Sequence, residues 1–584
     1  MKITGSSTAA RKIVIVGGVA GGMSAAARAR RLSEDSEIIV LERSGYVSYA
    51  NCGLPYYLGR EIDSEDTLIL QTPEALKERF NLDVRIHSEV VDIDPESKAI
   101  TIKNQTTSQT YRETYDDLIL AVGAAPVRPS VPGIDLPGLF TLRGIEDVQA
   151  IESWIEQKQP KSVVVAGGGF IGLEMAEQLT RRGLDVTVID GSDQVLAPLD
   201  PEMAALVHRE LIKHGVKVVL SSSIKEFRSP SNQDEIAPKS SWVIAGGHAP
   251  IFADLVIIGL GIRPELTLAK KAGLTVGDRG GIRVSEFLLT SAANIWAVGD
   301  AIEVLHPVNK QFTRIALGGP ANRQGRIVAD NIFGRKETYD GTLGTAILRA
   351  FDLTVAMTGL NESQVVLAGI PFEAIHLHPS QHAGYFPGAE RLDIKVLFRK
   401  ETGELLGAQV IGKDGVDKRI DILATALKAH MTVSDLADLE LAYAPPFGSA
   451  KDPINLLGMA GRNVLDGLVD QVQSDELPLL NTEEFCLLDV RSRTERELGF
   501  IPGSIHIPLP ELRKSLEKIP RDKTVVAYCQ SGQRSYYACR FLSQNSFVVK
   551  NLSGGYLTWK STADDVKAVD GISTAPLAVL AKGS

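Results

Sequence analysis

The chain has 584 residues, 44% hydrophobic and 23% charged, which is the composition of an ordinary soluble globular protein. This length is too great for one hydrophobic core and predicts about four domains. The formal net charge of −10 argues against nucleic-acid binding, and only four cysteines argue against a disulfide scaffold and favour a reducing cytoplasm. Because no apolar run reaches the length of a bilayer-spanning helix, we expect no membrane span.

A nucleotide-binding unit is predicted near the start of the chain. Residues 12–16 read as an apolar strand, a glycine turn and a helix follow, and a second strand ends at Glu42. Gly17 and Gly22 hold the outer positions of the G-x-G-x-x-G pattern, whereas Val19 occupies the middle one. Such glycines admit the backbone to a pyrophosphate, the helix N-terminus stabilises its charge, and the acid binds ribose hydroxyls. Taken alone, this pattern also fits a plain βαβ unit.

A second unit, at residues 162–190, carries the complete pattern. Gly167, Gly169 and Gly172 follow a strand and open a helix, and the next strand ends at Asp190. A carboxylate there accepts the ribose 2′-hydroxyl of NADH and repels the 2′-phosphate of NADPH, so NADH is favoured. Two such units on one chain predict FAD and a nicotinamide cofactor, with hydride passing between them.

Three further segments agree with a flavoprotein. Residues 116–126 read as a strand leading into a Gly/Pro crossover, and residues 293–301 read as a strand that ends in a Gly-Asp pair. The third segment is I-I-G-L-G-I-R-P-E, residues 257–265, which resembles the connection between the two nucleotide domains in the family named next. With these segments the chain resembles, from about residue 11 to 455, the two-dinucleotide-binding-domain flavoprotein disulfide reductases. The resemblance implies an α/β fold with two Rossmann-like domains, and it assigns the ribitol chain of FAD to Asp300.

A solitary cysteine, Cys52, lies in the segment Y-A-N-C-G-L-P-Y-Y, which the resemblance places under the flavin ring. Most disulfide reductases of this family carry a C-x4-C redox pair here, and this chain does not. The departure points to the single-cysteine branch, which contains CoA-disulfide reductases, NADH peroxidases and water-forming NADH oxidases. In the first the cysteine forms a mixed disulfide with coenzyme A, and in the other two it cycles through a sulfenic acid.

Basic residues on the first predicted helix favour coenzyme A. Arg28, Arg30 and Arg31 lie there, and Arg28 and Arg31 share a face. The fork of donors on a guanidinium suits the phosphates of coenzyme A. A solvated basic face is the alternative interpretation.

Individual CoA contacts follow only from the resemblance to CoA-disulfide reductases. The candidate residues are Ser24, Arg28, Arg31, Ser48, Asn51, Asn322 and Lys451. Two positions depart from the family: Arg28 replaces a polar residue of some members, and Phe80 stands where a lysine is expected, with Lys77 and Arg79 close by as substitutes.

Two segments, residues 382–387 and 442–453, resemble the dimerisation domain of CoA-disulfide reductases. In that domain two tyrosines of the partner subunit approach the active-site sulfur, and Tyr385 and Tyr443 match their positions. A phenol can protonate a leaving thiolate, which a cysteine without a partner thiol needs. The resemblance therefore implies a homodimer with tyrosines supplied across the interface, and ordinary interface aromatics are the alternative.

A different α/β pattern follows a polar linker and contains a second candidate thiol. A strand ends at Cys529, and a glycine loop leads to a helix that starts near Ser535. Such a loop points backbone N–H groups at one centre, which lowers the pKa of a thiol and stabilises a persulfide. Cys529 and Arg534 have the C-x4-R spacing of sulfurtransferases rather than the C-x5-R of phosphatases, and this stretch resembles a rhodanese domain. An inactive rhodanese used for docking is the alternative.

We expect no further catalytic site at the remaining cysteines and no metal site at the histidines. We interpret Cys486 and Cys539 as core and helix residues. No metal site is expected, because the histidines lack compact ligand spacing, and we interpret them as surface or interface residues: His306, His376, His378 and His382. The expected domains are an FAD domain (11–119 and 255–335), an NAD domain (120–254), a dimerisation domain (336–455), a linker (456–475) and a rhodanese domain (476–570).

As a whole the chain resembles the CoA-disulfide reductase–rhodanese fusions, also described as NADH-dependent persulfide or polysulfide reductases. The resemblance implies that NADH reduces FAD and that reduced flavin maintains Cys52 as a thiolate. Cys52 then attacks CoA disulfide, CoA persulfide or a polysulfide, and Cys529 carries sulfane sulfur to or from that centre. Two alternatives stay open: an NADH peroxidase or oxidase, and a flavoprotein redox sensor whose rhodanese docks a partner.

Overall fold

The first nucleotide-binding unit is built on five parallel strands in the order β18-β7-β1-β2-β3. In the computed structural model, residues 10–230 and 241–570 are described. The strands are β1 (Lys12–Val16), β2 (Glu37–Leu41), β3 (Asp83–Arg85), β7 (Asp117–Leu120) and β18 (Ile295–Ala297). Their aliphatic residues are buried, as a parallel sheet covered on both faces requires.

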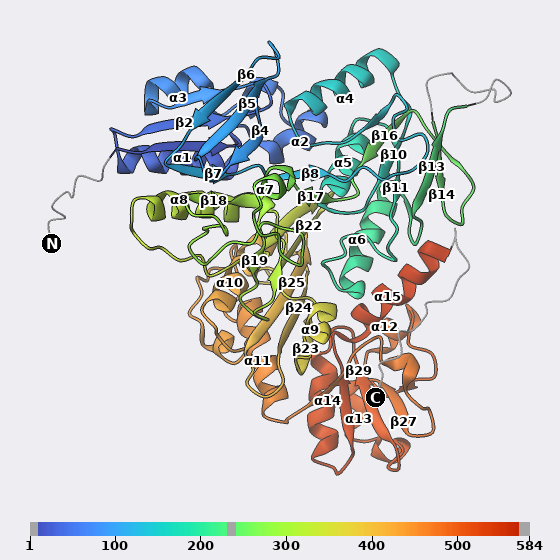
Figure 1. Cartoon of the computed structure of the whole chain (residues 1–584). Helices are drawn as coiled ribbons and strands as arrows, with labels where there is room; N and C mark the ends of the chain where they lie inside the picture. Colours follow the sequence, from blue (N-terminus) through green and yellow to red (C-terminus); the bar gives the residue numbers. More distant parts are fainter. Residues whose placement is uncertain (1–9, 231–240, 571–584) are drawn as a thin grey trace. The chain divides into compact units, whose positions relative to one another are not determined.

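Helices and a small antiparallel sheet surround these strands (Figure 1). Helices α1 and α8 pack against each other, and their small residues allow the backbones to come close. The helices are α1 (Ala20–Leu32), α2 (Leu54–Leu58), α3 (Pro73–Phe80), α7 (Thr267–Lys271) and α8 (Gly318–Ile332). The antiparallel sheet consists of β4 (Ser88–Asp94), β5 (Ala99–Asn104) and β6 (Thr110–Thr114).

Residues 124–186 and 224–264 contribute a second set of strands to the same compact unit, which comprises the chain up to residue 186 and residues 224–344. Strand β10 pairs with β16, and β16 pairs with β9. The elements are β8 (Ala124–Pro126), β9 (Leu139–Phe140), α4 (Ile145–Lys158), β10 (Ser162–Ala166), α5 (Phe170–Arg181), β13 (Ile224–Arg228), β14 (Ser241–Ala245), β15 (Ile251–Ala253), β16 (Leu255–Ile258) and β17 (Ile262–Pro264).

A second compact unit comprises residues 187–223 and the chain from residue 345 onwards. Its largest sheet is antiparallel, in the order β21-β22-β25-β24-β23, and the central strand β25 and its neighbour β24 are almost fully buried. The elements are β11 (Asp185–Ile189), α6 (Pro201–Lys213), β12 (Lys217–Val219), β21 (Ala346–Ala350), β22 (Leu353–Gly359), α9 (Glu362–Leu367), β23 (Phe372–Leu377), β24 (Leu392–Arg399), β25 (Leu405–Gly412), α10 (Val416–Lys428) and α11 (Pro453–Leu465).

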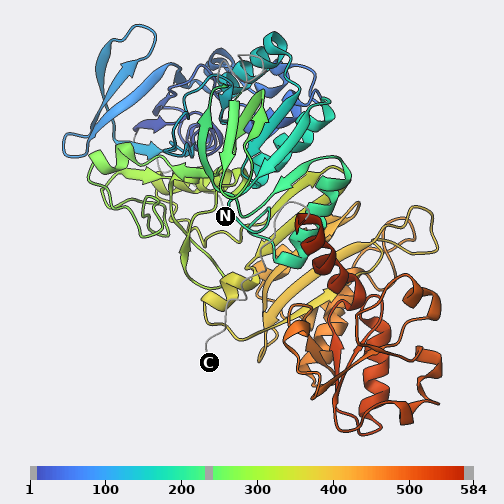
Figure 2. The same cartoon turned by 90° about the vertical axis from the view of Figure 1, so that its right-hand side faces the viewer.

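The C-terminal part of this second unit is a parallel sheet in the order β26-β30-β29-β27-β28. Its last helix, α15, lies against α6 (Figure 2). The elements are β26 (Asp470–Val472), β27 (Phe485–Asp489), α12 (Arg493–Glu497), β28 (Ile505–His506), α13 (Leu509–Leu512), β29 (Thr524–Tyr528), α14 (Gln533–Ser543), β30 (Val549–Leu552) and α15 (Gly555–Asp570).

The segment expected to be a linker, residues 456–475, differs from that prediction. Helix α11 continues to Leu465, and β26 pairs with β30 as an edge strand of the C-terminal sheet. The polar residues that suggest a linker occupy this edge, where one face of a strand is solvated. Within the described residues, no helix is both long and apolar enough to cross a bilayer.

Candidate active sites

Cys52 lies in the short 3-10 turn Asn51–Gly53, which leads directly into α2. Its side chain is exposed, and all four cysteines of the chain are free thiols. The backbone N–H of Cys52 donates to Asn51 Oδ1 at 3.1 Å, and its Sγ lies 3.7 Å from the same oxygen. Pro55 has no backbone N–H, but it lies in the first turn of α2, where N–H groups have no partner within the helix, so no hydrogen bond is lost. The turn therefore presents an unpaired thiol outward.

Carboxylates from two distant segments act on this thiol. Partial desolvation of the sulfur raises the pKa of the Cys52 thiol, and the negative charges of Glu174 on α5 and Asp300 after β18 raise it further. Burial also raises the pKa of Asp300. Glu174 accepts a hydrogen bond from the Tyr56 hydroxyl at 3.2 Å. The structure thus brings Cys52 and the predicted flavin ligand Asp300 into one neighbourhood.

The first glycine turn has the shape that a dinucleotide needs. Gly17 has a φ of +109°, and a Cβ there would lie 2.2 Å from the carbonyl oxygen of Ala121, so only glycine fits. Glu42 accepts hydrogen bonds from the N–H groups of Gly18 at 2.8 Å and Ser44 at 2.9 Å, which fix its carboxylate beside the turn. These residues, with Gly22 in the first turn of α1, fit FAD.

The second glycine turn repeats this geometry. Gly167 has a φ of +114°, and a Cβ there would meet the carbonyl oxygen of Gly259 at 2.2 Å. A Cβ at Gly169, which caps α5, would point into open space, where a backbone approach to pyrophosphate is unobstructed. Gly172 follows in the first turn of α5, and Asp190 follows β11 and accepts from the Ser192 N–H at 2.7 Å. This turn fits a nicotinamide dinucleotide.

The candidate CoA residues fall into different surroundings. Ser24 donates to Asn322 Oδ1 at 2.8 Å, so these two lie together. Arg28 is held by Asp330, with N–O distances of 3.0 and 2.6 Å. Arg31 and Lys451 are exposed. Ser48 has a φ of 47° and donates its N–H to the Gly18 carbonyl at 2.8 Å, which fixes the segment before Asn51 and Cys52.

The basic cluster on the first helix is only partly a surface feature. Arg30 is 3% exposed and donates to backbone carbonyls, among them Phe80 O at 2.9 Å and Glu34 O at 2.7 Å, so it anchors α1 to the end of α3. Lys77 donates to Asn81 at 2.8 Å, and the Arg79 guanidinium lies 5.3 Å from the Phe80 ring.

Tyr385 and Tyr443 come together although 58 residues separate them. Their hydroxyl oxygens are 3.3 Å apart, and both side chains are largely exposed. The hydrogen bond with Tyr443 raises the pKa of Tyr385. A phenol with a raised pKa stays protonated over the whole neutral range, which a proton donor requires.

Cys529 lies at the end of β29 and is fully buried. Its Sγ accepts a hydrogen bond from Ser535 Oγ at 3.4 Å. The loop turns at Gly532, with a φ of +89°, so α14 starts at Gln533, two residues before the expected position. Arg534 lies in the first turn of α14, where contacts with Glu495 above all, and with Cys529, raise its pKa. The structure therefore brings the two predicted rhodanese residues together.

Comparisons with known proteins cover all of these regions. The family description "Pyridine nucleotide-disulphide oxidoreductase" matches residues 11–325, and its dimerisation domain matches residues 346–452. The description "Rhodanese-like domain" matches residues 474–562. The chain belongs to the pyridine nucleotide-disulphide oxidoreductases. Its two Rossmann domains are followed by the dimerisation domain of this family and a C-terminal rhodanese domain.

Relatives of this oxidoreductase include a coenzyme A disulfide reductase from Staphylococcus haemolyticus, 33% identical over 78% of this chain and 100% of the relative. An NADH oxidase from Methanocaldococcus jannaschii is 35% identical over 76% of this chain and 97% of the relative. Among solved structures, reduced Bacillus anthracis CoADR-RHD has a TM-score of 0.92 and 48% identity, covering 95% of this chain and 99% of that one. An NAD-dependent persulfide reductase from A. fulgidus has a TM-score of 0.86 and 38% identity, covering 94% and 100%.

The interpretation of the histidines as surface or interface residues is wrong for this oxidoreductase. His306, His376 and His382 are at most 6% exposed, and the His378 side chain is 6% exposed. The reason is that polar groups inside the fold bond the rings, at both nitrogens for His376 and His378. One other group, Glu210, His214 and Asp352, brings three ligand-type atoms within 4.8 Å, but the Lys213 ammonium bonds both carboxylates.

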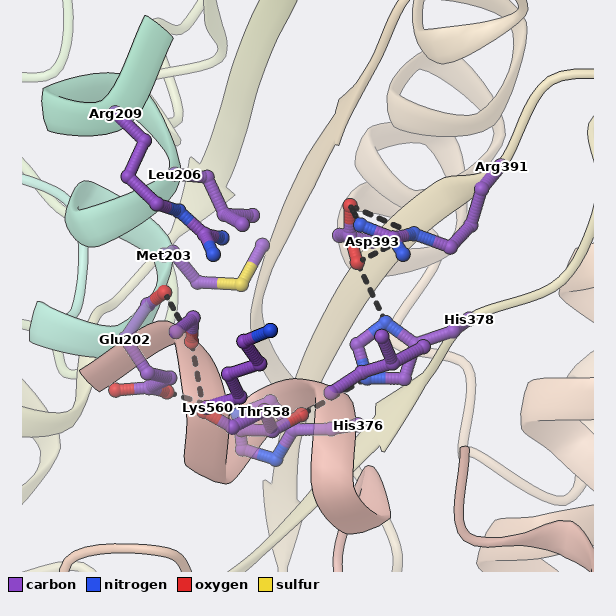
Figure 3. A pocket seen from close by; sticks show the side chains of 12 residues that line it. Glu202, Met203, Leu206, Arg209, His376, His378, Arg391, Asp393, Thr558 and Lys560 are labelled. Carbon is purple, nitrogen blue, oxygen red and sulfur yellow. Dashed lines mark hydrogen bonds and ion pairs between the residues drawn. The ribbon is translucent and has the colours of Figure 1, made fainter. Parts of the chain in front are cut away.

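Two of these histidines join the dimerisation sheet to the rhodanese segment, at a cavity of about 220 Å³ (Figure 3). His376 lies between Glu202 Oε1, 2.8 Å from Nε2, and Ser553 Oγ, 3.1 Å from Nδ1. His378 lies between Asp393 Oδ1 at 2.5 Å and Thr558 Oγ1 at 2.8 Å. Each imidazole therefore bridges a carboxylate to a hydroxyl of the rhodanese segment.

A buried lysine supports the first of these bridges. Lys395 is 1% exposed and contacts Asp200 at 2.8 Å and Glu202 at 2.5 Å. Burial opposes the charge of Glu202, but Lys395 and His376 outweigh it, and the pKa of Glu202 is lowered. Burial lowers the pKa of His376, which favours the neutral imidazole.

Sequence reasoning missed three residues near the two thiols. Glu174 gives no signal, because only the fold brings α5 to Cys52. Ser535 follows Arg534 directly and could have been found from its place at the start of the helix after the loop. Glu495 stands in the S-x-x-E pattern of a helix capping box, which the structure contains at Ser492.

Proposed function

We propose that this chain is an FAD-dependent NADH oxidoreductase that uses Cys52 to open the sulfur–sulfur bond of CoA disulfide, CoA persulfide or a polysulfide. The observation that carries the proposal is an unpaired, exposed thiol in the flavin-binding unit, within the electrostatic reach of Asp300. The names of the coenzyme A disulfide reductase and persulfide reductase relatives support this substrate class.

We assign the cofactors and CoA to separate groups of residues. FAD is assigned to Gly17, Gly22, Glu42 and Asp300, NADH to Gly167, Gly169, Gly172 and Asp190, and CoA to Ser24, Arg28, Arg31, Ser48, Asn51, Asn322 and Lys451. The Asp190 carboxylate favours NADH over NADPH. Arg28 must leave Asp330 before its guanidinium can bind a phosphate.

The proposed chemistry at Cys52 is one thiol–disulfide exchange followed by a two-electron reduction. When bound, FAD supplies sulfur with an electron pair derived from NADH. Cys52 Sγ attacks one sulfur of CoA disulfide, the old sulfur–sulfur bond breaks, and one CoA leaves as a thiolate. Two electrons and a proton then cleave the Cys52–CoA mixed disulfide, which releases the second CoA and restores Cys52. With CoA persulfide the products are CoA thiol and hydrogen sulfide.

Tyr385 and Tyr443 act in this scheme as acids for the leaving thiolate. We propose that they belong to the partner subunit of a homodimer, as the matched dimerisation domain favours. Their mutual hydrogen bond and the raised pKa of Tyr385 support a protonated phenol. Because both thiols must stay reduced between turnovers, we propose a cytoplasmic location.

At the second centre we propose that Cys529 carries sulfane sulfur as a persulfide, with Arg534 beside it. The glycine turn and the start of α14 support an anionic persulfide, and full burial of the sulfur shields it from other thiols. Sulfur delivered here would reach Cys52 as a persulfide substrate.

One competing function has a specific observation in its favour. One relative is named NADH oxidase, so oxidation of NADH by oxygen or peroxide is the competing activity. The test is to compare NADH consumption with CoA disulfide, CoA persulfide and hydrogen peroxide under nitrogen, and with oxygen alone. The proposal predicts that a sulfur substrate is turned over at least about tenfold faster than oxygen or peroxide, a difference of about 1.4 kcal/mol in the barrier. Rates with oxygen or peroxide that match the sulfur rates would replace it with the oxidase function.

A further inference from the structure

The rhodanese loop carries an unusual restraint on its arginine. Arg534 Nη1 lies 2.8 Å from Glu495 Oε2, and Nη2 lies 2.5 Å from Oε1, so the pair is bidentate. This contact with Arg534 is the main cause that lowers the pKa of Glu495 to about 2, so the carboxylate is charged at any neutral pH. The cation of the loop therefore faces a permanent anion.

Glu495 is itself fixed in place. Its Oε2 accepts hydrogen bonds from the N–H of Ser492 at 3.0 Å and from the Ser492 hydroxyl at 2.9 Å. These contacts form the capping box of α12, so the carboxylate cannot swing away from Arg534 without uncapping the helix.

The other arginine that reaches the loop is compensated as well. Arg491 lies 3.4 Å from Gln530 Oε1, but its guanidinium is buried against Asp489, with an N–O distance of 2.8 Å. Asp489 is shared with Arg496, whose guanidinium lies 3.2 Å from it, whereas Glu495 pairs with Arg534, the cation that interacts with Cys529. A donor with two negative charges next to the reacting sulfur would therefore find the charge of Arg534 largely neutralised.

Two exposed apolar side chains follow α12. Leu498 is 79% exposed and Phe500 is 46% exposed, and both flank Gly499, whose carbonyl accepts from Arg491 at 2.8 Å. The Arg496 guanidinium lies 4.1 Å from the Phe500 ring, so one of these side chains is covered by a cation and Leu498 is the freer apolar contact. An exposed apolar side chain suits a donor with an organic body, whereas an inorganic dianion gains nothing from it.

We propose that Glu495 is a specificity-determining residue that makes this rhodanese centre prefer organic persulfides over thiosulfate. The proposal rests on the proposed role of Cys529 as a sulfur carrier. A persulfide presents one negative charge at its terminal sulfur, while thiosulfate presents two charges around its sulfonate. Glu495 neutralises Arg534 for the second donor and leaves the N–H groups of the loop to bind the first.

The transfer balances without any further reactant. With a persulfide, the Cys529 thiolate attacks the terminal sulfur of R–S–S⁻, the sulfur–sulfur bond breaks, and R–S⁻ takes up a proton and leaves as a thiol. Cys529 then holds the sulfane sulfur as Cys529–S–S⁻. With thiosulfate the same attack releases sulfite. Neither reaction needs an oxidant or a reductant.

The test is a donor comparison in the full-length protein with its cofactors. Cyanide is the common acceptor, and glutathione persulfide and thiosulfate are the donors. Glu495→Gln removes the charge but keeps a residue that can complete the capping box. We expect kcat/KM for thiosulfate to rise about tenfold, which corresponds to about 1.4 kcal/mol, and kcat/KM for glutathione persulfide to stay within about threefold.

Glu511→Gln is the matched control, because Glu511 pairs with Arg493 at 2.9 Å on the same domain and does not contact Arg534. It should leave the donor ratio unchanged, and thermal unfolding should show that both variants are folded. An equal change for both donors, an unchanged rate with thiosulfate, or a wild-type protein that prefers thiosulfate would overturn the proposal. Cys529→Ser separates the two claims: if sulfur transfer survives it, the role of Cys529 fails, whatever Glu495 does.

Discussion

Cys52 is exposed in a turn beside Glu174 and Asp300, whereas Cys529 is fully buried at the end of β29 with Ser535 at its sulfur. These surroundings suit the opposite requirements of the two roles that we propose. A thiol that exchanges with CoA must admit a large partner, so it stands at a surface. A thiol that holds one extra sulfur atom needs shelter from water and from other thiols, so it stands behind a loop.

The surroundings also differ in charge. Desolvation and the carboxylates beside Cys52 oppose its thiolate, so the thiol is less ionised at neutral pH than a free cysteine. Cys529 lies where a glycine loop meets the start of α14, with Arg534 in reach. On the proposed roles, the chain separates exchange of sulfur bonds from storage of sulfur by exposing one thiol and enclosing the other.

The largest expected effect comes from removing each thiol in turn. Cys52→Ser should lower NADH-dependent reduction of CoA disulfide at least about a thousandfold, because no other thiol can form the mixed disulfide. Cys529→Ser should abolish transfer of sulfane sulfur to cyanide. Each variant should keep the other activity within about twofold. Loss of both activities in either single variant would contradict two separate centres.

The next effect concerns the acid that the exposed centre needs. A double variant, Tyr385→Phe and Tyr443→Phe, should lower turnover with CoA disulfide about a hundredfold, since a leaving thiolate loses its proton donor. The absorbance of bound flavin should not change. Tyr537→Phe, at an exposed tyrosine of the rhodanese helix α14, is the control and should be silent. Unchanged turnover in the double variant would remove the tyrosines from the mechanism.

A smaller effect is expected from a substitution that weakens the packing around Cys529 and leaves Cys52 unchanged. Ser553 Oγ accepts the N–H of His376 at 3.1 Å, and Gly555, two residues on, packs against the carbonyl of Cys529. Ser553→Ala leaves a buried donor unsatisfied, which costs about 1–3 kcal/mol.

Hydrogen exchange at residues 553–558 should then rise about tenfold or more, while exchange at residues 50–58 stays the same. Ser543→Ala, at the end of α14, is the control and should change neither segment. Equal protection in the Ser553 variant and the wild type would show that the bridge does not hold the loop.

The smallest effect tests the electrostatics of Cys52. Glu174→Gln removes one of the charges that raise the pKa of the thiol, so the pKa should fall and the thiolate fraction at neutral pH should rise. The alkylation rate of Cys52 can be measured at a series of pH values from the mass of its peptide. The midpoint of this pH profile should move to a lower pH. Glu78→Gln, on the exposed face of α3, is the control. A profile that does not move, or moves to higher pH, would contradict this account of the site.

Much of the fold follows from local patterns. Residues 12–16 and 524–528 are strands as expected, because apolar runs bounded by glycine loops have few other solutions. The two glycine turns could also be predicted, from the spacing of their glycines. The structure gives the physical reason: φ is above +100° at Gly17 and Gly167, a conformation that suits only glycine.

What escaped prediction depends on contacts between distant segments. The segment 456–475 reads as a polar linker, yet β26 is an edge strand whose partner, β30, lies about eighty residues further on. His376 reads as a surface histidine, and only the fold supplies Glu202 and Ser553 to its ring. Arg28 reads as a phosphate ligand, and Asp330 of α8 holds it.

The most direct test of the central claim is the mass of the protein after incubation with CoA disulfide, measured before and after thiol reduction and followed by peptide mapping. The account predicts one CoA per chain, attached to the peptide that contains Cys52 and released by the reductant. Oxygen additions at Cys52 without CoA, or CoA found only on Cys529, would contradict it.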